Sequence, residues 1–249
     1  MMSASERTRH GAHRSVEGIN TFRDREEAGV LLAERLQAYH ADPSTIVVAL
    51  PRGGLIVGHT ISQALRVPLE VFLSRKLGAP DNPEYAIGAV TETGSIYYNP
   101  EALRMMGGFS TAGRYFNEII QTQRDEIRRR QELYRNGRLL PDLKNRTVLL
   151  VDDGVATGAT FLAAVDALRN LQVRRLIAAI PVGPEEALRK IAASVDSLVV
   201  LSVPEQFTAV GNHYVSFPQI SDEEVLRCLA QARSAGTKGN LRPEFENGH

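Results

Sequence analysis

The sequence predicts an α/β protein built on a parallel twisted sheet of about five strands with helices on both faces. Five short apolar, β-prone runs occur along the chain, at residues 45–50, 69–74, 147–151, 174–180 and 197–203. Near-continuous apolar runs of this kind are typical of strands that are covered on both faces. Segments with helical spacing separate the runs, which favours parallel pairing through helical crossovers.

Composition limits the class of protein. The chain has 249 residues with 29 basic and 29 acidic side chains, so its net charge gives no support for a nucleic-acid or anionic-membrane partner. The single cysteine, Cys228, excludes a disulfide framework and fits a reducing, cytoplasmic location. No apolar run has transmembrane length, and the polar N-terminus lacks the apolar centre of a signal peptide.

The two ends of the chain lack the periodicity of the rest. Residues 1–20 are rich in Ser, Arg, Gly and His, and we expect them to form a disordered arm. Residues 234–249 are expected to be a disordered tail. One domain is therefore predicted over residues 21–233, beginning with an amphipathic helix at 22–39 and ending with a helix that starts near Ser221 and runs to Ala232.

The most informative stretch follows the strand at 147–151. That strand stops at Asp152 and Asp153, and a turn of small and hydroxyl-bearing residues leads into a helix. Ligands of open α/β sheets bind at the carboxyl ends of the strands. The free N–H groups of Gly158, Ala159 and Thr160 at the helix start favour a phosphate, and two carboxylates suit a diol. A phosphate beside a diol describes a ribose 5-phosphate.

Residues 151–160, with the sequence VDDGVATGAT, resemble the phosphoribosyl pyrophosphate (PRPP) signature of type I phosphoribosyltransferases. The resemblance extends over about residues 22–232. It implies that Asp152 and Asp153 bind the ribose hydroxyls. It also implies that the 5-phosphate is bound by five consecutive residues, namely Ala156, Thr157, Gly158, Ala159 and Thr160.

A second strand–loop–helix unit occurs at residues 45–65. Its loop, Pro51-Arg52-Gly53-Gly54, is a candidate anion-binding turn, and no Walker A lysine follows it. The family holds its pyrophosphate loop at this position, which assigns Arg52 and Gly53 to pyrophosphate. The strand at 69–74 is expected to end at Arg75 and Lys76, and the resemblance favours Lys76 as a further pyrophosphate ligand; a solvated strand end is the alternative.

An insertion at about residues 77–110 follows. It begins with a Pro- and Gly-rich loop, and two β-prone runs then flank residues 92–95 as a hairpin. The sequence of residues 75–90 resembles that of a bacterial subgroup of phosphoribosyltransferases with no assigned substrate. The insertion lies where type I enzymes have a flexible loop, so it is a candidate lid that excludes water. Glu84 is a candidate ligand contact within it, although a surface role is favoured.

Two later segments complete the domain. A charged helix is expected at 111–135, and its arginines are interpreted as a solvated face, with a pyrophosphate contact as the alternative. Residues 204–220 correspond to the hood that receives the base in the family. Phe207 and Tyr214 could stack on a ring there, or they could belong to the core.

The resemblance implies a PRPP- and Mg²⁺-dependent transferase that releases pyrophosphate, acts on a small-molecule acceptor and forms a homodimer. Magnesium is expected mostly on substrate oxygens, so no protein ligand is assigned. One departure concerns the acceptor: enzymes for 6-oxopurines usually carry Asp where this chain has Ala156. This weakens hypoxanthine and guanine as substrates and leaves the acceptor open.

The same sequence bears on three other functions. A PRPP-binding regulator without transferase activity is the alternative, and near-zero net charge with no appended DNA-binding segment argues against it. A dinucleotide-binding oxidoreductase is excluded because no Gly-x-Gly-x-x-Gly follows a strand. An α/β-hydrolase is excluded because the chain has no Gly-x-Ser-x-Gly.

Overall fold

A five-stranded parallel sheet forms the centre of the computed structural model, which describes residues 21–79, 82–105 and 109–238. The strands are β1 (Thr45–Ala49), β2 (Leu69–Val71), β6 (Thr147–Val151), β7 (Arg175–Val182) and β8 (Ser197–Ser202), in the spatial order β2-β1-β6-β7-β8. Every neighbouring pair is parallel, and β1 pairs with β6 in register from Thr45 opposite Thr147 to Ala49 opposite Val151. The predicted fold class is confirmed.

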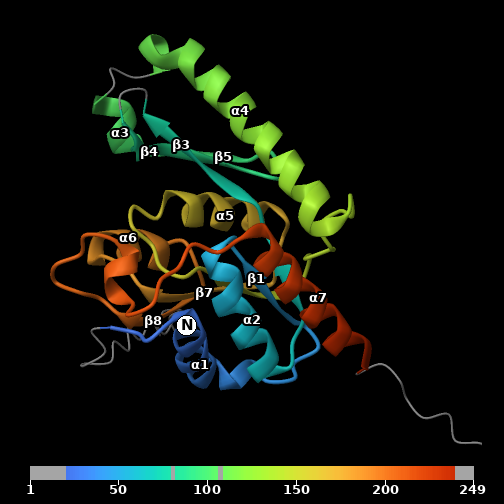
Figure 1. Cartoon of the computed structure of the whole chain (residues 1–249). Helices are drawn as coiled ribbons and strands as arrows, with labels where there is room; N and C mark the ends of the chain where they lie inside the picture. The colour runs from blue at the N-terminus through green and yellow to red at the C-terminus, as the bar shows by residue number, and fades with distance from the viewer. Residues whose placement is uncertain (1–20, 80–81, 106–108, 239–249) are drawn as a thin grey trace, which may run out of the picture.

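Helices cover both faces of this sheet because alternate strand residues point to opposite sides. Helices α1 (Arg25–Arg35) and α2 (Gly53–Leu65) bury one set, which includes Val47, Leu149 and Ile177. Helices α5 (Ala159–Asn170) and α6 (Glu185–Ala192) bury the other set, which includes Val48 and Leu150. Figure 1 shows the sheet between these two helical layers.

A second, three-stranded sheet corrects the expected course of the chain after β2. The strand predicted at 69–74 ends at Val71, and β3 (Ser74–Ala79) begins a separate antiparallel sheet with β4 (Asn82–Thr91) and β5 (Ile96–Tyr98). The predicted hairpin around residues 92–95 is the β4–β5 turn. The stretch 77–79, predicted as loop, is strand. Arg75 and Lys76 therefore lie within β3 and not at the end of a strand of the large sheet.

The small sheet packs between α5 and two further helices, α3 (Pro100–Met105) and α4 (Phe109–Arg135). In Figure 1 this layer stands above α5, with the long α4 along its outer side. Helix α4 has the extent expected from sequence, with two more residues at its start.

A buried ion-pair network joins the two sheets where α4 ends. The guanidinium of Arg135 is almost fully buried and binds the carboxylates of Glu92 in the β4–β5 hairpin and Glu70 in β2, as well as the carbonyl of Val71. Glu92 also accepts a 2.8 Å hydrogen bond from the backbone N–H of Leu73. One arginine thus fixes α4, the hairpin and the edge of the large sheet relative to one another.

After β8, the segment at 204–220 contains a short 3₁₀ helix, η2 (Val210–His213), and leads into α7 (Asp222–Lys238). Another short 3₁₀ helix, η1 (Gln37–Tyr39), follows α1. Helix α7 packs against α2 and continues beyond the expected end at Ala232. The predicted arm at 1–20 and the part of the predicted tail at 239–249 lie outside the described residues. Within the described ranges, no helix is both long enough and apolar enough to cross a membrane.

Candidate active site

The two candidate ligand loops lie side by side because β1 and β6 are neighbours at the centre of the large sheet. After β1 the chain continues to β2 on one side, and after β6 it continues to β7 on the other side. Open α/β sheets bind ligands at the point between two strands where the strand order reverses in this way. The backbone N–H of Leu50, after β1, donates a 2.9 Å hydrogen bond to the carbonyl of Val151. The loops 51–54 and 152–158 therefore leave the sheet together.

The residues predicted to bind a 5-phosphate line one pocket. A cavity of about 200 Å³ is bounded by the continuous segment 154–160 and by Lys76 and Ala86 of the small sheet. Gly158 has φ +75°, a left-handed conformation that favours glycine, and it precedes the first turn of α5. Gly158 has no side chain with which to cap this helix, and the N–H of Ala159 makes a long 3.4 Å hydrogen bond to the Thr157 hydroxyl. The N–H groups of the first turn and the helix dipole can face an anion in the pocket.

The two adjacent carboxylates have different surroundings. Asp152 is half-buried and accepts a 2.9 Å hydrogen bond from the backbone N–H of Asp153. Burial raises the pKa of Asp152 well above its ordinary value, and the charge of Asp153 raises it further. Asp153 instead forms an ion pair with Arg25 of α1, with 2.7 Å between Nε and Oδ2. Arg25 was not predicted as a site residue.

Gly53 is required where the first loop approaches this carboxylate. A Cβ placed on Gly53 would lie 1.8 Å from Oδ2 of Asp153, which is far inside any van der Waals contact. The neighbouring Gly54 packs on the backbone of Asp152, where a Cβ would lie 2.8 Å from Cα. The first loop therefore depends on glycine at both positions for its close approach to the second loop.

A second cavity adjoins the pocket of residues 154–160 and has a cationic lining. It has a volume of about 350 Å³ and shares Lys76 and Thr160 with that pocket. Its other charged residues are Arg75 of β3 and Arg130 of α4, and none of the described residues that line it is a carboxylate. Burial lowers the pKa of Arg75, and the charge of Arg130 lowers it further.

The two arginines of this cavity have different partners. Glu126 is shared by Arg129 and Arg130, at 2.8 Å and 2.7 Å. Arg75 has Gln123 as its hydrogen-bond partner, at 2.9 Å, and among the described residues it makes no ion pair. Arg52 also acts on Arg75 as a neighbouring positive charge. Helix α4 is thus not solvated along its whole basic face, since the Arg130 side chain is only 12% exposed.

The two aromatic residues of the predicted hood have different positions. Tyr214 is buried between Phe22 and Phe217, and its hydroxyl donates a 2.6 Å hydrogen bond to the carbonyl of Asp153. The tyrosine ring therefore belongs to the core, the alternative considered from sequence. Phe207 is half-buried and stacks on His213 with ring centroids 5.4 Å apart. The hood itself contacts the central loop, because Val210 packs against Gly154.

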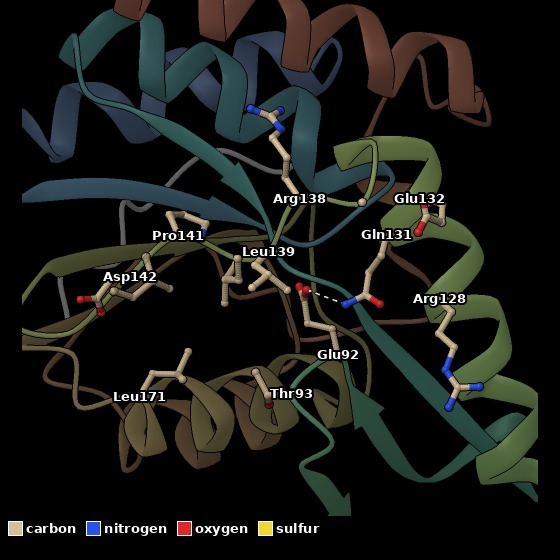
Figure 2. Close-up of a pocket in the computed structure, with 13 residues that line it drawn as sticks. Glu92, Thr93, Arg128, Gln131, Glu132, Arg138, Leu139, Pro141, Asp142 and Leu171 are labelled. Carbon is tan, nitrogen blue, oxygen red and sulfur yellow. Dashed lines mark hydrogen bonds between the residues drawn. The ribbon is translucent and has the colours of Figure 1, made fainter.

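The remaining predicted residue, Glu84, belongs to β4, and its side chain lies outside the described residues. A separate cavity of about 510 Å³ lies at the junction of the small sheet, the end of α4 and α5 (Figure 2). Its lining includes Glu92 and Gln131, which are joined by a 3.2 Å hydrogen bond, and none of the predicted site residues. This cavity borders the Arg135 network and is distinct from the loops of β1 and β6.

A metal ion would need a cluster of suitable ligand side chains. Within the described part of the chain, no group of three or more His, Cys, Asp or Glu side chains is arranged to hold a metal. Mg²⁺ commonly keeps several waters and binds through substrate phosphates. The residues present therefore fit Mg²⁺ only as an ion carried largely by its substrate.

Comparison with known proteins gives three findings. A family model described as "Phosphoribosyl transferase domain" matches residues 25–213. Proteins from two strains of Mycobacterium tuberculosis, each named "Putative phosphoribosyl transferase", are 38% identical over 214 residues, which is 86% of this chain and 47% of each relative. The chain thus spans about half the length of these relatives. The crystal structure of TT1426 from Thermus thermophilus is 42% identical, with a TM-score of 0.70, covering 85% of this chain and 98% of that one.

Proposed function

Because the chain belongs to the phosphoribosyl transferase domain family, we propose that it transfers the phosphoribosyl group of PRPP to an acceptor and releases pyrophosphate. The acceptor would be a nucleobase or another nitrogen nucleophile. The observation that carries the proposal is the phosphate pocket: residues 154–160 and Lys76 surround one cavity directly beside Asp152 and Asp153. An anion-binding turn, two carboxylates and a nearby cation would suit a 5-phosphate, a ribose diol and a diphosphate.

Each loop has a role in this proposal. The turn at 156–160 anchors the 5-phosphate through backbone N–H groups and the hydroxyls of Thr157 and Thr160. Asp152 and Asp153 hold the ribose hydroxyls. The loop of Arg52 and Gly53, together with Lys76, holds the pyrophosphate. These contacts fix the ribose while its C1–O bond to pyrophosphate breaks and a C1–N bond to the acceptor forms.

The cationic cavity extends the leaving-group site of this proposal. As the C1–O bond breaks, negative charge accumulates on the departing pyrophosphate, and fixed cations in a site with little water stabilise it. Arg75 and Arg130 supply such cations next to Lys76, and the described residues of the lining include no carboxylate. Helix α4 would then take part in leaving-group binding, which was the less favoured reading of its sequence.

Magnesium is part of the proposal as a substrate-bound ion. It would neutralise part of the charge of the pyrophosphate when bound, and water would complete its coordination. The protein would orient the loaded pyrophosphate through Arg52, Lys76 and the amide groups of the loop at 53–54. The hood at 204–220 would exclude water from the ribose and receive the acceptor. The small residue Ala156 leaves the choice of acceptor open.

The proposal is tested by mixing the protein with PRPP and Mg²⁺ and measuring pyrophosphate release across a panel of bases and amines. Release with one acceptor is the expected result, and a matched reaction without acceptor measures background hydrolysis. PRPP binding without release with any acceptor would favour the PRPP-binding regulator. Absence of PRPP binding in a calorimetric titration would contradict the assignment of residues 152–160.

The contribution of α4 gives a separate prediction. Arg130→Gln is expected to weaken pyrophosphate binding by about tenfold to a hundredfold, because it removes a desolvated charge-assisted contact of about 1.5–3 kcal/mol. Arg128→Gln on the same helix is the matched control, since Arg128 is 69% exposed and paired with Asp125. Its effect is expected to be within about twofold, as for most exposed ion pairs. Equal effects in isothermal titration with pyrophosphate would remove α4 from the site.

A further inference from the structure

Arg25 occupies a position that a helix-surface arginine seldom has. It begins α1, yet only 7% of the residue is exposed. Its guanidinium makes three different contacts: Nε donates to Oδ2 of Asp153 at 2.7 Å, Nη1 donates to the carbonyl of Pro218 at 2.8 Å, and Cζ lies 3.7 Å from the ring centre of Phe217. Pro218 and Phe217 both belong to the hood segment.

Residues of the hood also connect Arg25 back to Asp153. Phe217 packs on Tyr214 with ring centroids 4.9 Å apart, and the Tyr214 hydroxyl donates to the backbone carbonyl of Asp153 at 2.6 Å. Asp153 is therefore held twice, at its side chain by Arg25 and at its backbone by Tyr214. Gly53 also packs against the Asp153 carboxylate, because there is no room for a Cβ next to Oδ2.

The ion pair with Arg25 uses one of the two carboxylate oxygens of Asp153. Arg25 binds Oδ2, which leaves Oδ1 for other partners, and the neighbouring carboxyl of Asp152 also interacts with the Asp153 side chain. A planar guanidinium that is itself stacked and hydrogen-bonded orients a carboxylate more rigidly than an ammonium does. Oδ1 is thus presented in a fixed direction at the end of β6, where the diol of the ribose is placed by the proposed function.

We infer that Arg25 is a positioning residue for ribose recognition, holding Asp153 in its ribose-binding orientation and tying it to the hood. This inference rests on the proposed function, because it needs Asp153 to bind the ribose. The alternative is that Arg25 has only a structural role and stabilises the packing of α1 against the rest of the protein. The two differ in ligand selectivity: loss of positioning affects ligands that contain ribose, whereas a general loss of structure affects every ligand.

The test compares three ligands on four proteins by isothermal titration. The ligands are PRPP with Mg²⁺, ribose 5-phosphate, and pyrophosphate with Mg²⁺. The proteins are the wild type, Arg25→Met, Arg25→Lys and the control Arg23→Met. Arg23 lies two residues earlier, has a side chain that is 67% exposed and pairs only locally with Asp24. Thermal melting of every variant measures the contribution of Arg25 to stability.

With Arg25→Met, the affinity for ribose 5-phosphate and PRPP is expected to fall about tenfold or more, whereas pyrophosphate binding changes by less than about threefold. Arg25→Lys is expected to lose less, because an ammonium can still face Oδ2. The control is expected to match the wild type. If Arg25→Met does not fold, Arg25→Lys is compared with the wild type on the same three ligands, with ribose 5-phosphate expected to be affected more than pyrophosphate.

Three results would overturn the inference: unchanged affinity of Arg25→Met for ribose 5-phosphate, equal losses for all three ligands, or equal losses with Arg25→Met and Arg25→Lys. These outcomes leave the proposed function standing, because they require ligand binding by the wild type. If the wild type binds neither PRPP nor ribose 5-phosphate, the proposed function itself fails, and this inference fails with it.

Discussion

The double variant Asp152→Asn, Asp153→Asn is expected to lose PRPP affinity by about a hundredfold or more, since hydrogen bonds to charged groups contribute about 1.5–3 kcal/mol each. Asparagine keeps the size and one acceptor oxygen of aspartate but removes its charge. The ribose hydroxyls would then face weaker acceptors. Pyrophosphate, which we place on other residues, is expected to bind with unchanged affinity. Isothermal titration with both ligands measures the two effects.

The single variants are expected to shift the melting temperature in opposite directions. Burial and the neighbouring Asp153 raise the pKa of Asp152 in the folded protein. A carboxyl whose pKa is raised on folding opposes folding once pH exceeds its unfolded pKa, about 3.9. Asp152→Asn should therefore stabilise the free protein at neutral pH and have little effect in acid. Asp153→Asn should destabilise it, because it leaves Arg25 buried without a charged partner.

Circular dichroism of each asparagine variant confirms that the fold is retained. Unchanged PRPP affinity in a folded double variant would remove the ribose-binding role from both residues. A stabilised Asp152→Asn protein that still bound PRPP normally would limit the role to Asp153. A destabilised Asp152→Asn protein would contradict the raised pKa of this carboxyl. Opposed effects on stability and binding would be typical of a site that sacrifices stability for function.

The variant Arg135→Met is expected to lower the free energy of unfolding by about 3–5 kcal/mol, as is typical when one partner of a buried ion pair is removed. Arg135 and the side chain of Glu92 are almost completely buried. Methionine would fill much of the space but would leave two carboxylates, those of Glu92 and Glu70, without their cation. Urea denaturation followed by circular dichroism measures the change.

The matched control is Arg128→Met, on the exposed side of the same helix, for which about 0–1 kcal/mol is expected. The pair Arg135→Met, Glu92→Leu should be less destabilised than the sum of its single variants, because the two residues interact directly. A loss with Arg135→Met no larger than that of the control would mean that the network contributes little to joining α4 to the two sheets.

The elements that could be predicted are those whose signal lies within a few consecutive residues. The buried strands of the large sheet are apolar runs, and the turn at 152–160 has its carboxylates and hydroxyls in sequence. The strand β3 was missed because it is polar at Ser74, Arg75 and Lys76 and forms the edge of a small sheet. An edge strand that is only partly covered has no continuous apolar pattern to reveal it.

Contacts between distant residues could not be predicted from the same patterns. Arg25 and Asp153 are 128 positions apart, and Arg25 stands in a charged segment with nothing to distinguish it from Arg23. Arg130 likewise follows two more exposed arginines, and its burial depends on how α4 turns against β3. Pairing of this kind is set by tertiary packing, so the site could be located from sequence but its supporting residues could not.

The turn that we propose for the 5-phosphate stands at the start of helix α5, and the small sheet packs along this helix, with the Ser74 hydroxyl donating to the Thr160 carbonyl at 3.1 Å. The groups proposed for the ribose, for the leaving group and for the acceptor thus come from different parts of the chain, with the ribose on the turn at 152–160 and the acceptor at the hood. Evolution could alter the insertion or the hood without rebuilding the ribose site. Such an arrangement would let one scaffold acquire new acceptors by small, local steps.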